Sequence, residues 1–332
     1  TEFYELRHFT EATEETAEYL TWGEQEFALS PMQVFQCTEM PEFAVGAEIC
    51  EDLWVSNPPS SALAAAGATI IYNLSASDEI IGKAAYRRDL VRMQSGRGQC
   101  GYVYCDAGQG ESSTDLVFAA HNIIAENGSI LAQSKRFATG LTISEIDVKR
   151  MDYERRRQNT FHTEDVFDYA EIPFDMQLRE TTLTRTVAQT PFVPSNKDDL
   201  AERCEEILTL QATGLATRVR HAHAKTAVVG LSGGLDSALA LVVTVHAFDM
   251  LGRDRKDIIA VTMPCFGTTS RTKNNALTLA AAYGTTCKTI EIGASVTQHF
   301  IDIGHDMEDH SVTFENGQAR ERTQVLMDLA NK

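Results

Sequence analysis

Hydrophobic and polar positions follow two patterns along this chain, one typical of strands and one typical of helices. In the first half, short apolar runs predict buried strands at residues 43–49, 68–74, 102–105 and 141–146. Apolar residues at helical spacing predict helices between them, at residues 60–66 and 82–99. The dipeptide Asn127-Gly128 separates two further runs, residues 116–126 and 129–134, and predicts a β-hairpin. Strands alternating with helices and followed by a hairpin indicate a layered α/β domain.

The pattern weakens in the middle of the chain. Residues 160–197 contain three prolines and little periodicity, which is typical of a linker or an extended arm. Helical spacing returns over residues 200–219, where Ser195 or Asn196 is placed to cap the helix. We therefore expect two domains and a linker, at residues 1–160, 197–332 and 161–196.

The second half alternates more regularly. Predicted strands at residues 226–229, 258–263 and 287–292 alternate with helices that begin near residues 238, 274, 294 and 318. This order is typical of a doubly wound parallel sheet, in which the ligand site lies at the carboxyl ends of the strands.

The run Gly230-Leu231-Ser232-Gly233-Gly234-Leu235-Asp236-Ser237 follows the first of these strands. Two glycines let an anion approach the backbone, and the unpaired N–H groups of the following helix attract phosphate. The loop has no lysine, unlike a Walker loop, and carries Asp236 instead. A carboxylate there suits a Mg²⁺-bound pyrophosphate, with the hydroxyls of Ser232 and Ser237 as further ligands. The alternative is a glycine-rich turn in which Asp236 only caps the helix.

Cys50 stands at the carboxyl end of the strand predicted over residues 43–49, which is where an exposed nucleophile is placed. The alternative is a small hydrophobic residue of the core. The nearby acidic residues Glu48, Glu51 and Asp52 disfavour a thiolate, and the first lysine after Cys50 is Lys83. A reactive Cys50 therefore needs a cation from elsewhere in the fold.

Composition narrows the classes of function. The chain has 29 basic and 47 acidic residues, a net charge of −18, which argues against a nucleic-acid-binding surface. Seven cysteines without Cys-x-x-Cys spacing indicate a reducing compartment. The absence of a signal peptide and of a long apolar run favours a soluble cytoplasmic protein with no membrane contact. The residues His305, Asp306, Asp309 and His310 fit no zinc spacing, and we interpret them as a polar loop.

The ends of the chain also carry information. Residue 1 is Thr, and the last residues stop within a helical pattern that has no glycine cap. We therefore expect this sequence to be a segment of a longer protein.

The loop over residues 232–237 resembles the Ser-Gly-Gly-x-Asp-Ser loop of the N-type ATP pyrophosphatases. That family cleaves ATP between the α- and β-phosphates and adenylylates a substrate; it includes NAD, GMP and asparagine synthetases and several tRNA-modifying enzymes. The acidic charge of the chain weakens the tRNA-modifying alternative.

Residues 2 to about 160 resemble the glutaminase domain of glutamine-dependent NAD synthetases, a branch of the nitrilase superfamily. The segments that carry the resemblance are residues 48–54, 73–77, 86–92, 108–118 and 125–128. The resemblance implies an α/β/β/α layered fold. It also implies that Cys50 forms a thioester with glutamine and releases ammonia, with Glu51 beside it as the second catalytic residue.

The same resemblance assigns glutamine contacts to four residues, but it assigns the family's catalytic Glu and Lys to no residue of this sequence. The implied contacts are Phe3, Trp54, Ser77 and Lys83, with Trp54 in place of a phenylalanine of the relatives. The family's catalytic Glu and Lys would precede residue 3, so we expect this chain alone to be a poor glutaminase.

Residues 263–273 and 312–320 also resemble NAD synthetases. The resemblance implies that Met263 lies beside adenine, that Asn316 contacts deamido-NAD, and that Arg320 lies near the nucleotide. A Gly-Thr-Gly segment that completes the pocket in the family does not occur before the end of this sequence.

Together these features favour a segment of a glutamine-dependent NAD synthetase. It would use glutamine, ATP and deamido-NAD as substrates, Mg²⁺ as cofactor, and a homo-oligomer as its assembly. One alternative is another amidotransferase with a pyrophosphatase loop, such as a GMP-synthetase-like enzyme, although Cys50 lacks the Gly-x-Cys-x-Gly setting of that glutaminase. The other alternative is a catalytically incomplete chain that only binds ligands or builds an assembly.

Overall fold

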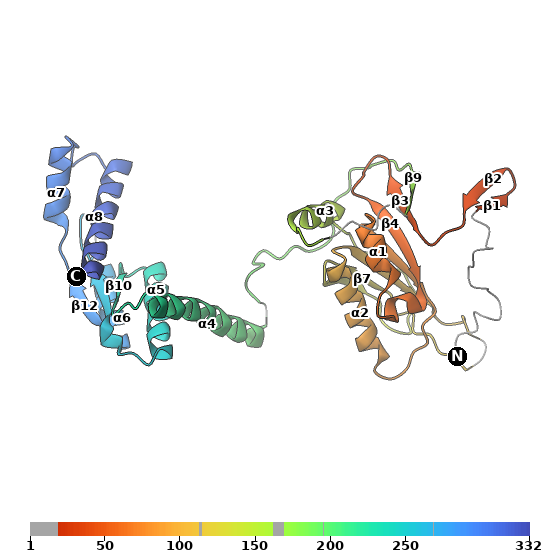
Figure 1. The fold of residues 1–332 in the computed structure, drawn as a ribbon, viewed down its shortest axis with the longest axis horizontal. Coiled ribbons are helices and arrows are strands. Elements are labelled where there is room, and N and C mark those ends of the chain that lie inside the picture. Colours follow the sequence, from red (N-terminus) through yellow and green to blue (C-terminus); the bar gives the residue numbers. More distant parts are fainter. Residues whose placement is uncertain (1–18, 113–114, 162–168, 195, 268) are drawn as a thin grey trace. The chain divides into compact units, whose positions relative to one another are not determined.

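The computed structural model describes residues 19–112, 115–161, 169–194, 196–267 and 269–332. The chain forms two compact units, Thr1–Val187 and Ala188–Lys332 (Figure 1), and each is described by itself. The domain limits expected from the sequence remain a prediction.

The first unit is built on a seven-stranded sheet with the order β8-β7-β6-β5-β4-β3-β9. Its central strands β4, β5 and β6 are parallel, whereas β7 and β8 continue the sheet antiparallel at one side. The strands are β3 (Gln33–Cys37), β4 (Ala44–Ile49), β5 (Ile70–Ser75), β6 (Gly101–Asp106), β7 (Ile123–Glu126), β8 (Ser129–Gln133) and β9 (Ala170–Phe174). A separate hairpin consists of β1 (Tyr19–Trp22) and β2 (Gln25–Ala28).

Helices α1 (Pro59–Ala65) and α2 (Lys83–Arg97) cover one face of this sheet (Figure 1). Leu63 of α1 and Val91 of α2 pack with Ile71 and Tyr102 of the sheet in one buried core. The predicted hairpin is confirmed, since β7 and β8 pair across Asn127 and Gly128, whose φ angles of 43° and 81° suit a tight turn.

One predicted strand is wrong. Residues 141–146 form no strand, although they are rich in β-branched and apolar residues. Ile143 and Ile146 instead line a cavity of about 460 Å³ together with Ile70, Tyr72 and Val103 of the sheet. Ile146 lies against Gly101 of β6, whereas Leu141 and Ile143 are exposed, so the apolar residues of this segment do not mark a paired strand.

Helix α3 (Val148–Arg157) and strand β9 are among the elements of the first unit that lie where no regular structure was predicted. Helix α3 begins with Asp147, whose side chain caps Arg150 N–H, and it buries Met151. Strand β9, within the expected linker, pairs in parallel with β3. Arg185 then ties the following stretch to the sheet through two hydrogen bonds to the carboxylate of Glu126, of 2.8 and 3.1 Å.

The second unit contains a parallel sheet of three strands in the order β10-β11-β12. These strands are β10 (Ala227–Gly230), β11 (Ile258–Thr262) and β12 (Thr286–Thr289). The helices are α4 (Lys197–His221), α5 (Leu235–Met250), α6 (Ser270–Tyr283), α7 (Gly293–Asp302) and α8 (Val312–Asn331). Asn196 caps α4 by accepting Asp198 N–H, as one of the two predicted alternatives.

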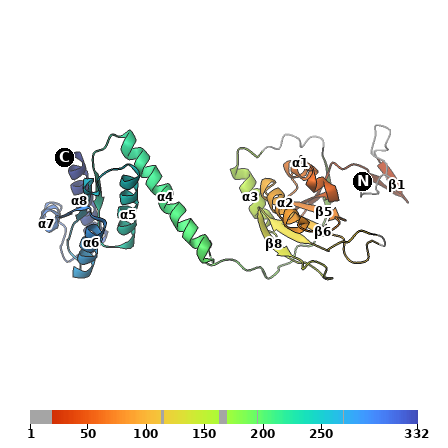
Figure 2. The ribbon, with the colours of Figure 1, turned by 90° about the horizontal axis from the view of Figure 1, so that it is seen from below.

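Helices lie on both faces of this sheet (Figure 2). Val219, Val245 and Ala280, from α4, α5 and α6, share a core with Ile258 and Ala260. On the opposite face, α7 and α8 pack against Val261 through buried residues that include Val296 and Phe300. The sheet is therefore doubly wound, and the predicted α/β fold class is confirmed. No helix in the described ranges is long and apolar enough to cross a bilayer.

Candidate functional site

Cys50 begins a short 3₁₀ turn, Cys50–Trp54, directly after strand β4. Its φ angle is 48°, a left-handed conformation that is uncommon for a residue other than glycine. The residue is partly exposed, so the alternative of a core cysteine is not what the structure describes. A partly exposed cysteine on a sharp strand-to-helix turn is in the setting of a nucleophile.

The backbone N–H groups at the junction of β4 with the turn donate hydrogen bonds to nearby side chains. Asp52 accepts Ile49 N–H at 2.8 Å, and Asn73 accepts Cys50 N–H at 3.1 Å. Glu48 is buried at 2% exposure and accepts Ser60 N–H at 2.7 Å. Glu51 is exposed on the turn. Of the three acidic residues near Cys50, two therefore have structural partners.

The structure brings three of the expected glutamine-site residues to the same part of the sheet. β4 and β5 are parallel, so the turn that holds Trp54 and the loop that holds Ser77 lie at the same carboxyl edge. Lys83 lies 5.3 Å from the centre of the Trp54 ring and donates to the Asp78 carboxylate at 2.7 Å. Phe3, the fourth expected contact, lies outside the described residues.

A buried polar cluster supports the loop around Ser77. The Arg87 guanidinium is fully buried and donates to Glu79 at 2.7 Å, next to His121 Nδ1 at 3.0 Å. Burial, and then the charge of Arg87, lower the pKa of His121 from 6.5 to about 4. His121 is therefore neutral in the folded protein at physiological pH.

This lowered pKa predicts a pH dependence of the first unit's stability. Folded His121 binds fewer protons than unfolded His121, so the free energy of unfolding is highest above pH 6.5 and falls as the pH drops toward 4. We expect a loss of up to about 3 kcal/mol, and a smaller loss in His121→Gln. Both tryptophans, Trp22 and Trp54, belong to the first unit, so urea titrations followed by tryptophan fluorescence report on it alone. An equal loss in both proteins would contradict the prediction.

In the second unit, the glycine loop joins β10 to α5 at the carboxyl edge of the parallel sheet. Ser232 Oγ accepts Gly234 N–H at 3.2 Å and lies 3.0 Å from Ser237 Oγ. Gly233 has a φ of +84°, and a Cβ added there would lie 2.1 Å from Thr272 O. Residue 233 must therefore be glycine, because any side chain there would collide with the backbone of α6.

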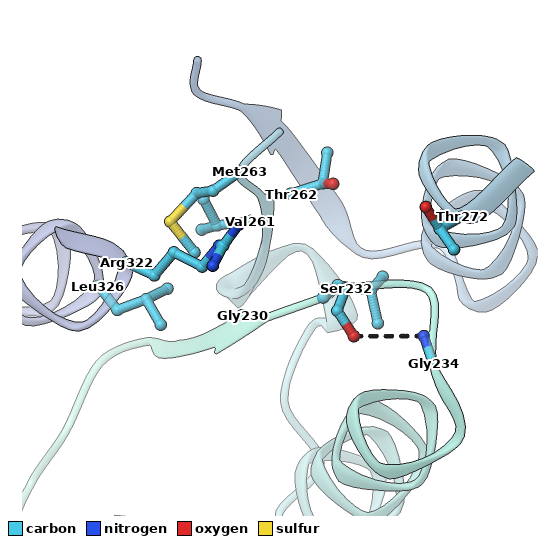
Figure 3. A pocket seen from close by; sticks show the side chains of 10 residues that line it. Gly230, Ser232, Gly234, Val261, Thr262, Met263, Thr272, Arg322 and Leu326 are labelled. Carbon is cyan, nitrogen blue, oxygen red and sulfur yellow. Dashed lines mark hydrogen bonds between the residues drawn. The ribbon is translucent and has the colours of Figure 1, made fainter. Parts of the chain in front are cut away.

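This loop lines a cavity of about 520 Å³ (Figure 3). Ser232 and Gly234 lie on one side, while Met263 and Arg322 lie across from them and Thr272 contributes from α6. The further lining residues are Gly230, Leu231, Val261, Thr262 and Leu326. The loop and Met263, both assigned to the nucleotide from the sequence, thus border one cavity, although Gly233, Leu235, Asp236 and Ser237 are not among its lining residues.

Helix α8 contributes different residues from those expected. Asn316 and Arg320 are exposed on α8 and do not line the cavity, whereas Arg322 and Leu326 do. Sequence reasoning missed these two residues, although their spacing of four places them on one face of a helix. It also missed Thr272, which precedes the start predicted for α6.

The glycine loop can contribute a ligand to a Mg²⁺ ion, but it does not supply enough side-chain ligands to surround the ion. Asp236 is exposed in the first turn of α5, and no group of three or more His, Cys, Asp or Glu side chains suited to a metal occurs within the described ranges. Mg²⁺ commonly takes one or two carboxylates and completes its shell with phosphate and water. His305, in the predicted polar loop, lies near the carbonyl of Asp309, with 3.0 Å between Nε2 and O.

Comparison with known families assigns each unit. Residues 6–156 match the carbon-nitrogen hydrolase family, and residues 207–332 match the NAD synthase family. The first unit, with a cysteine at the edge of its sheet, and the second, with its glycine loop, therefore define a protein that joins a carbon-nitrogen hydrolase domain to an NAD synthase domain.

Relatives with the same two parts are known. The chain is 39% identical over 345 residues to the glutamine-dependent NAD(+) synthetase of Mycobacterium tuberculosis, covering 100% of this chain and 51% of that protein. It is 29% identical over 299 residues to the protein of that name from Thermotoga maritima, covering 87% and 48%. A solved glutamine-dependent NAD+ synthetase from Acinetobacter baumannii, in complex with ADP, gives a TM-score of 0.36 at 21% identity, covering 98% of this chain and 50% of that one. Over its whole length the chain is therefore similar in sequence to glutamine-dependent NAD(+) synthetases, and it spans about half the length of the curated relatives it matches.

Proposed function

We propose that the protein makes NAD from deamido-NAD, ATP and glutamine, releasing AMP, pyrophosphate and glutamate. The observation that carries this proposal is that one chain holds both a partly exposed cysteine at a sheet edge and a glycine loop on a cavity, in two segments that match the two corresponding families. Glutamine chemistry belongs to the first unit and ATP chemistry to the second.

In the first unit, the Cys50 thiolate would attack the carboxamide carbon of glutamine. The C–N bond then breaks, ammonia leaves, and water hydrolyses the thioester to glutamate. Ile49 and Cys50 N–H already donate to Asp52 and Asn73, so the N–H groups of Glu51 and Asp52, at the start of the turn, would hold the oxyanion. Phe3, Trp54, Ser77 and Lys83 would bind the rest of glutamine.

In the second unit, the loop from Gly230 to Ser237 would bind the pyrophosphate part of ATP. Its backbone N–H groups and the positive end of α5 favour an anion, and Met263 would contact the adenine. Asn316 and Arg320 would bind deamido-NAD. Asp236 would hold Mg²⁺, which neutralises phosphate charge when bound. Adenylylation of the nicotinate carboxylate would release pyrophosphate, and ammonia would then displace AMP to form NAD.

The setting of this activity follows from the chain as a whole. Seven free cysteines suit a reducing compartment, and we propose that the protein acts in the cytoplasm. We also propose a homo-oligomer, because ammonia must pass between two active sites without escaping.

Binding of pyrophosphate to the second unit is the direct test of its loop. With Mg²⁺ present and pyrophosphate at about 100 times its Kd, we expect about 2.7 kcal/mol of stabilisation. That corresponds to an increase of about 5–10 °C in the unfolding temperature of a unit of this size. Scanning calorimetry resolves the transitions of the two units, and sulfate at equal ionic strength is the control. An unchanged second transition would refute a phosphate site at the loop.

A further inference from the structure

The backbone of Cys50 needs a specific support. Its φ of 48° costs free energy for a residue with a side chain, and such a conformation persists only where its surroundings hold it. The geometry of the turn decides the direction in which the thiol leaves the end of β4. A group that fixes this backbone therefore also fixes the nucleophile.

Asn73 of β5 makes that contact with both ends of its amide. Its Oδ1 accepts Cys50 N–H at 3.1 Å, and its Nδ2 donates to Cys50 O at 3.3 Å. The Asn73 side chain is fully buried, so neither hydrogen bond competes with bulk water. The parallel pairing of β4 with β5 sets Asn73 opposite Glu48, two residues before Cys50, within reach of the turn.

Glu48, opposite Asn73 in the register of β4 and β5, belongs to a buried hydrogen-bond network. Tyr102 is fully buried and donates a short hydrogen bond to Glu48, which also accepts Ser60 N–H at 2.7 Å. Burial and the charge of Glu48 raise the pKa of Tyr102 well above its ordinary value, whereas a hydrogen bond from the Asn73 side chain lowers it. The Tyr102 hydroxyl therefore stays protonated and donates its single hydrogen to Glu48.

We propose that Asn73 is a positioning residue for Cys50: its buried amide holds the nucleophile's backbone in the left-handed conformation through its two hydrogen bonds. The proposal rests on the proposed glutaminase function of this site. Since Asn73 takes up Cys50 N–H, this N–H is not available to a developing oxyanion.

Two probes of the thiol separate positioning from general structural damage. The glutamine analogue 6-diazo-5-oxo-norleucine alkylates a cysteine that is aligned with a bound carboxamide, whereas iodoacetamide needs only access. For Asn73→Ala we expect about a tenfold or greater loss of analogue labelling at Cys50, with iodoacetamide labelling unchanged or faster. Asn73→Asp keeps the acceptor for Cys50 N–H but loses the donor, so we expect an intermediate loss. Labelling is measured by peptide mass mapping.

Asn122→Ala is a matched control. The Asn122 side chain accepts Asp106 N–H at 2.8 Å on the same sheet, so this variant loses a comparable hydrogen bond at another residue. We expect wild-type analogue labelling of Cys50 in this control. If Asn73→Ala does not fold, as judged by tryptophan fluorescence, Asn73→Asp, which keeps the acceptor for Cys50 N–H, carries the test. Labelling of the test variants within the error of wild type would overturn the proposal.

Hydrogen exchange at the Cys50 amide separates this proposal from the proposed function. If the analogue fails to label Cys50 in an unaltered form of the protein that hydrolyses glutamine, glutamine chemistry at Cys50 is refuted and exchange decides the role of Asn73. We expect exchange of the Cys50 amide to be about tenfold or more faster in Asn73→Ala than in the unaltered protein. Equal exchange rates would show that Asn73 does not hold this backbone.

Discussion

Replacement of Cys50 by alanine is expected to abolish NAD formation from glutamine and to leave NAD formation from free ammonia unchanged. The variant removes the sulfur that would form the thioester, and loss of a nucleophile commonly lowers a rate by at least about 1,000-fold. The turn that carries Cys50 belongs to the first unit and the glycine loop to the second, so the synthetase step keeps all its residues. The measurement compares NAD formed from glutamine with NAD formed from ammonium salts, in a form of the protein that is active with both.

Cys105→Ala is the matched control for this experiment. Cys105 is exposed near the carboxyl end of the neighbouring strand β6, where it pairs in register with Leu74. Although the residue is exposed, partial desolvation of its thiol by the surrounding protein raises the pKa of Cys105, which disfavours the thiolate. We expect Cys105→Ala to retain both activities. Loss of the ammonia-dependent activity in Cys50→Ala, or survival of the glutamine-dependent one, would contradict the assignment of Cys50.

The sequence predicted most of what depends on local patterning. The strand before Cys50, the hairpin at Asn127-Gly128 and the alternation after residue 226 are local signals, and the structure confirms each. Residues 141–146 have the same apolar content as a strand but lie along a sheet face. Leu141 and Ile143 of this segment are exposed, so its apolar pattern predicted neither burial nor strand pairing correctly.

Site residues that directly follow a predicted strand could be found from the sequence. Site residues that depend on contacts between distant segments could not. Cys50 and the glycine loop follow strands, so their exposure at a sheet edge could be inferred. The hydrogen bonds from Asn73 to the Cys50 backbone depend on the pairing of β4 with β5. The position of Arg322 in the cavity wall depends on how α8 packs beside β10. Both are tertiary contacts between segments distant in sequence, which no single-sequence pattern encodes.

The second large effect is expected at the glycine loop, for Gly233→Ala. A Cβ at residue 233 would lie 2.1 Å from Thr272 O and 2.9 Å from Thr272 C, and these are backbone atoms of α6 that cannot rotate away. The φ of +84° adds a conformational cost of about 1 kcal/mol. The loop must therefore move away from α6, which displaces the N–H groups that would hold pyrophosphate. We expect affinity for Mg²⁺-pyrophosphate to fall by at least about 100-fold, since several such contacts are lost together.

Gly252→Ala separates the clash from the backbone cost. Gly252 has a φ of +64°, and an added Cβ there meets no atom within 4 Å, so this variant carries the conformational strain alone. Isothermal titration with pyrophosphate should give wild-type affinity for Gly252→Ala and a large loss for Gly233→Ala, while the unfolding temperatures of both variants drop. An equal affinity in the two variants would mean that the contact between Gly233 and Thr272 does not shape the anion site, because backbone strain would then account for everything that Gly233→Ala changes.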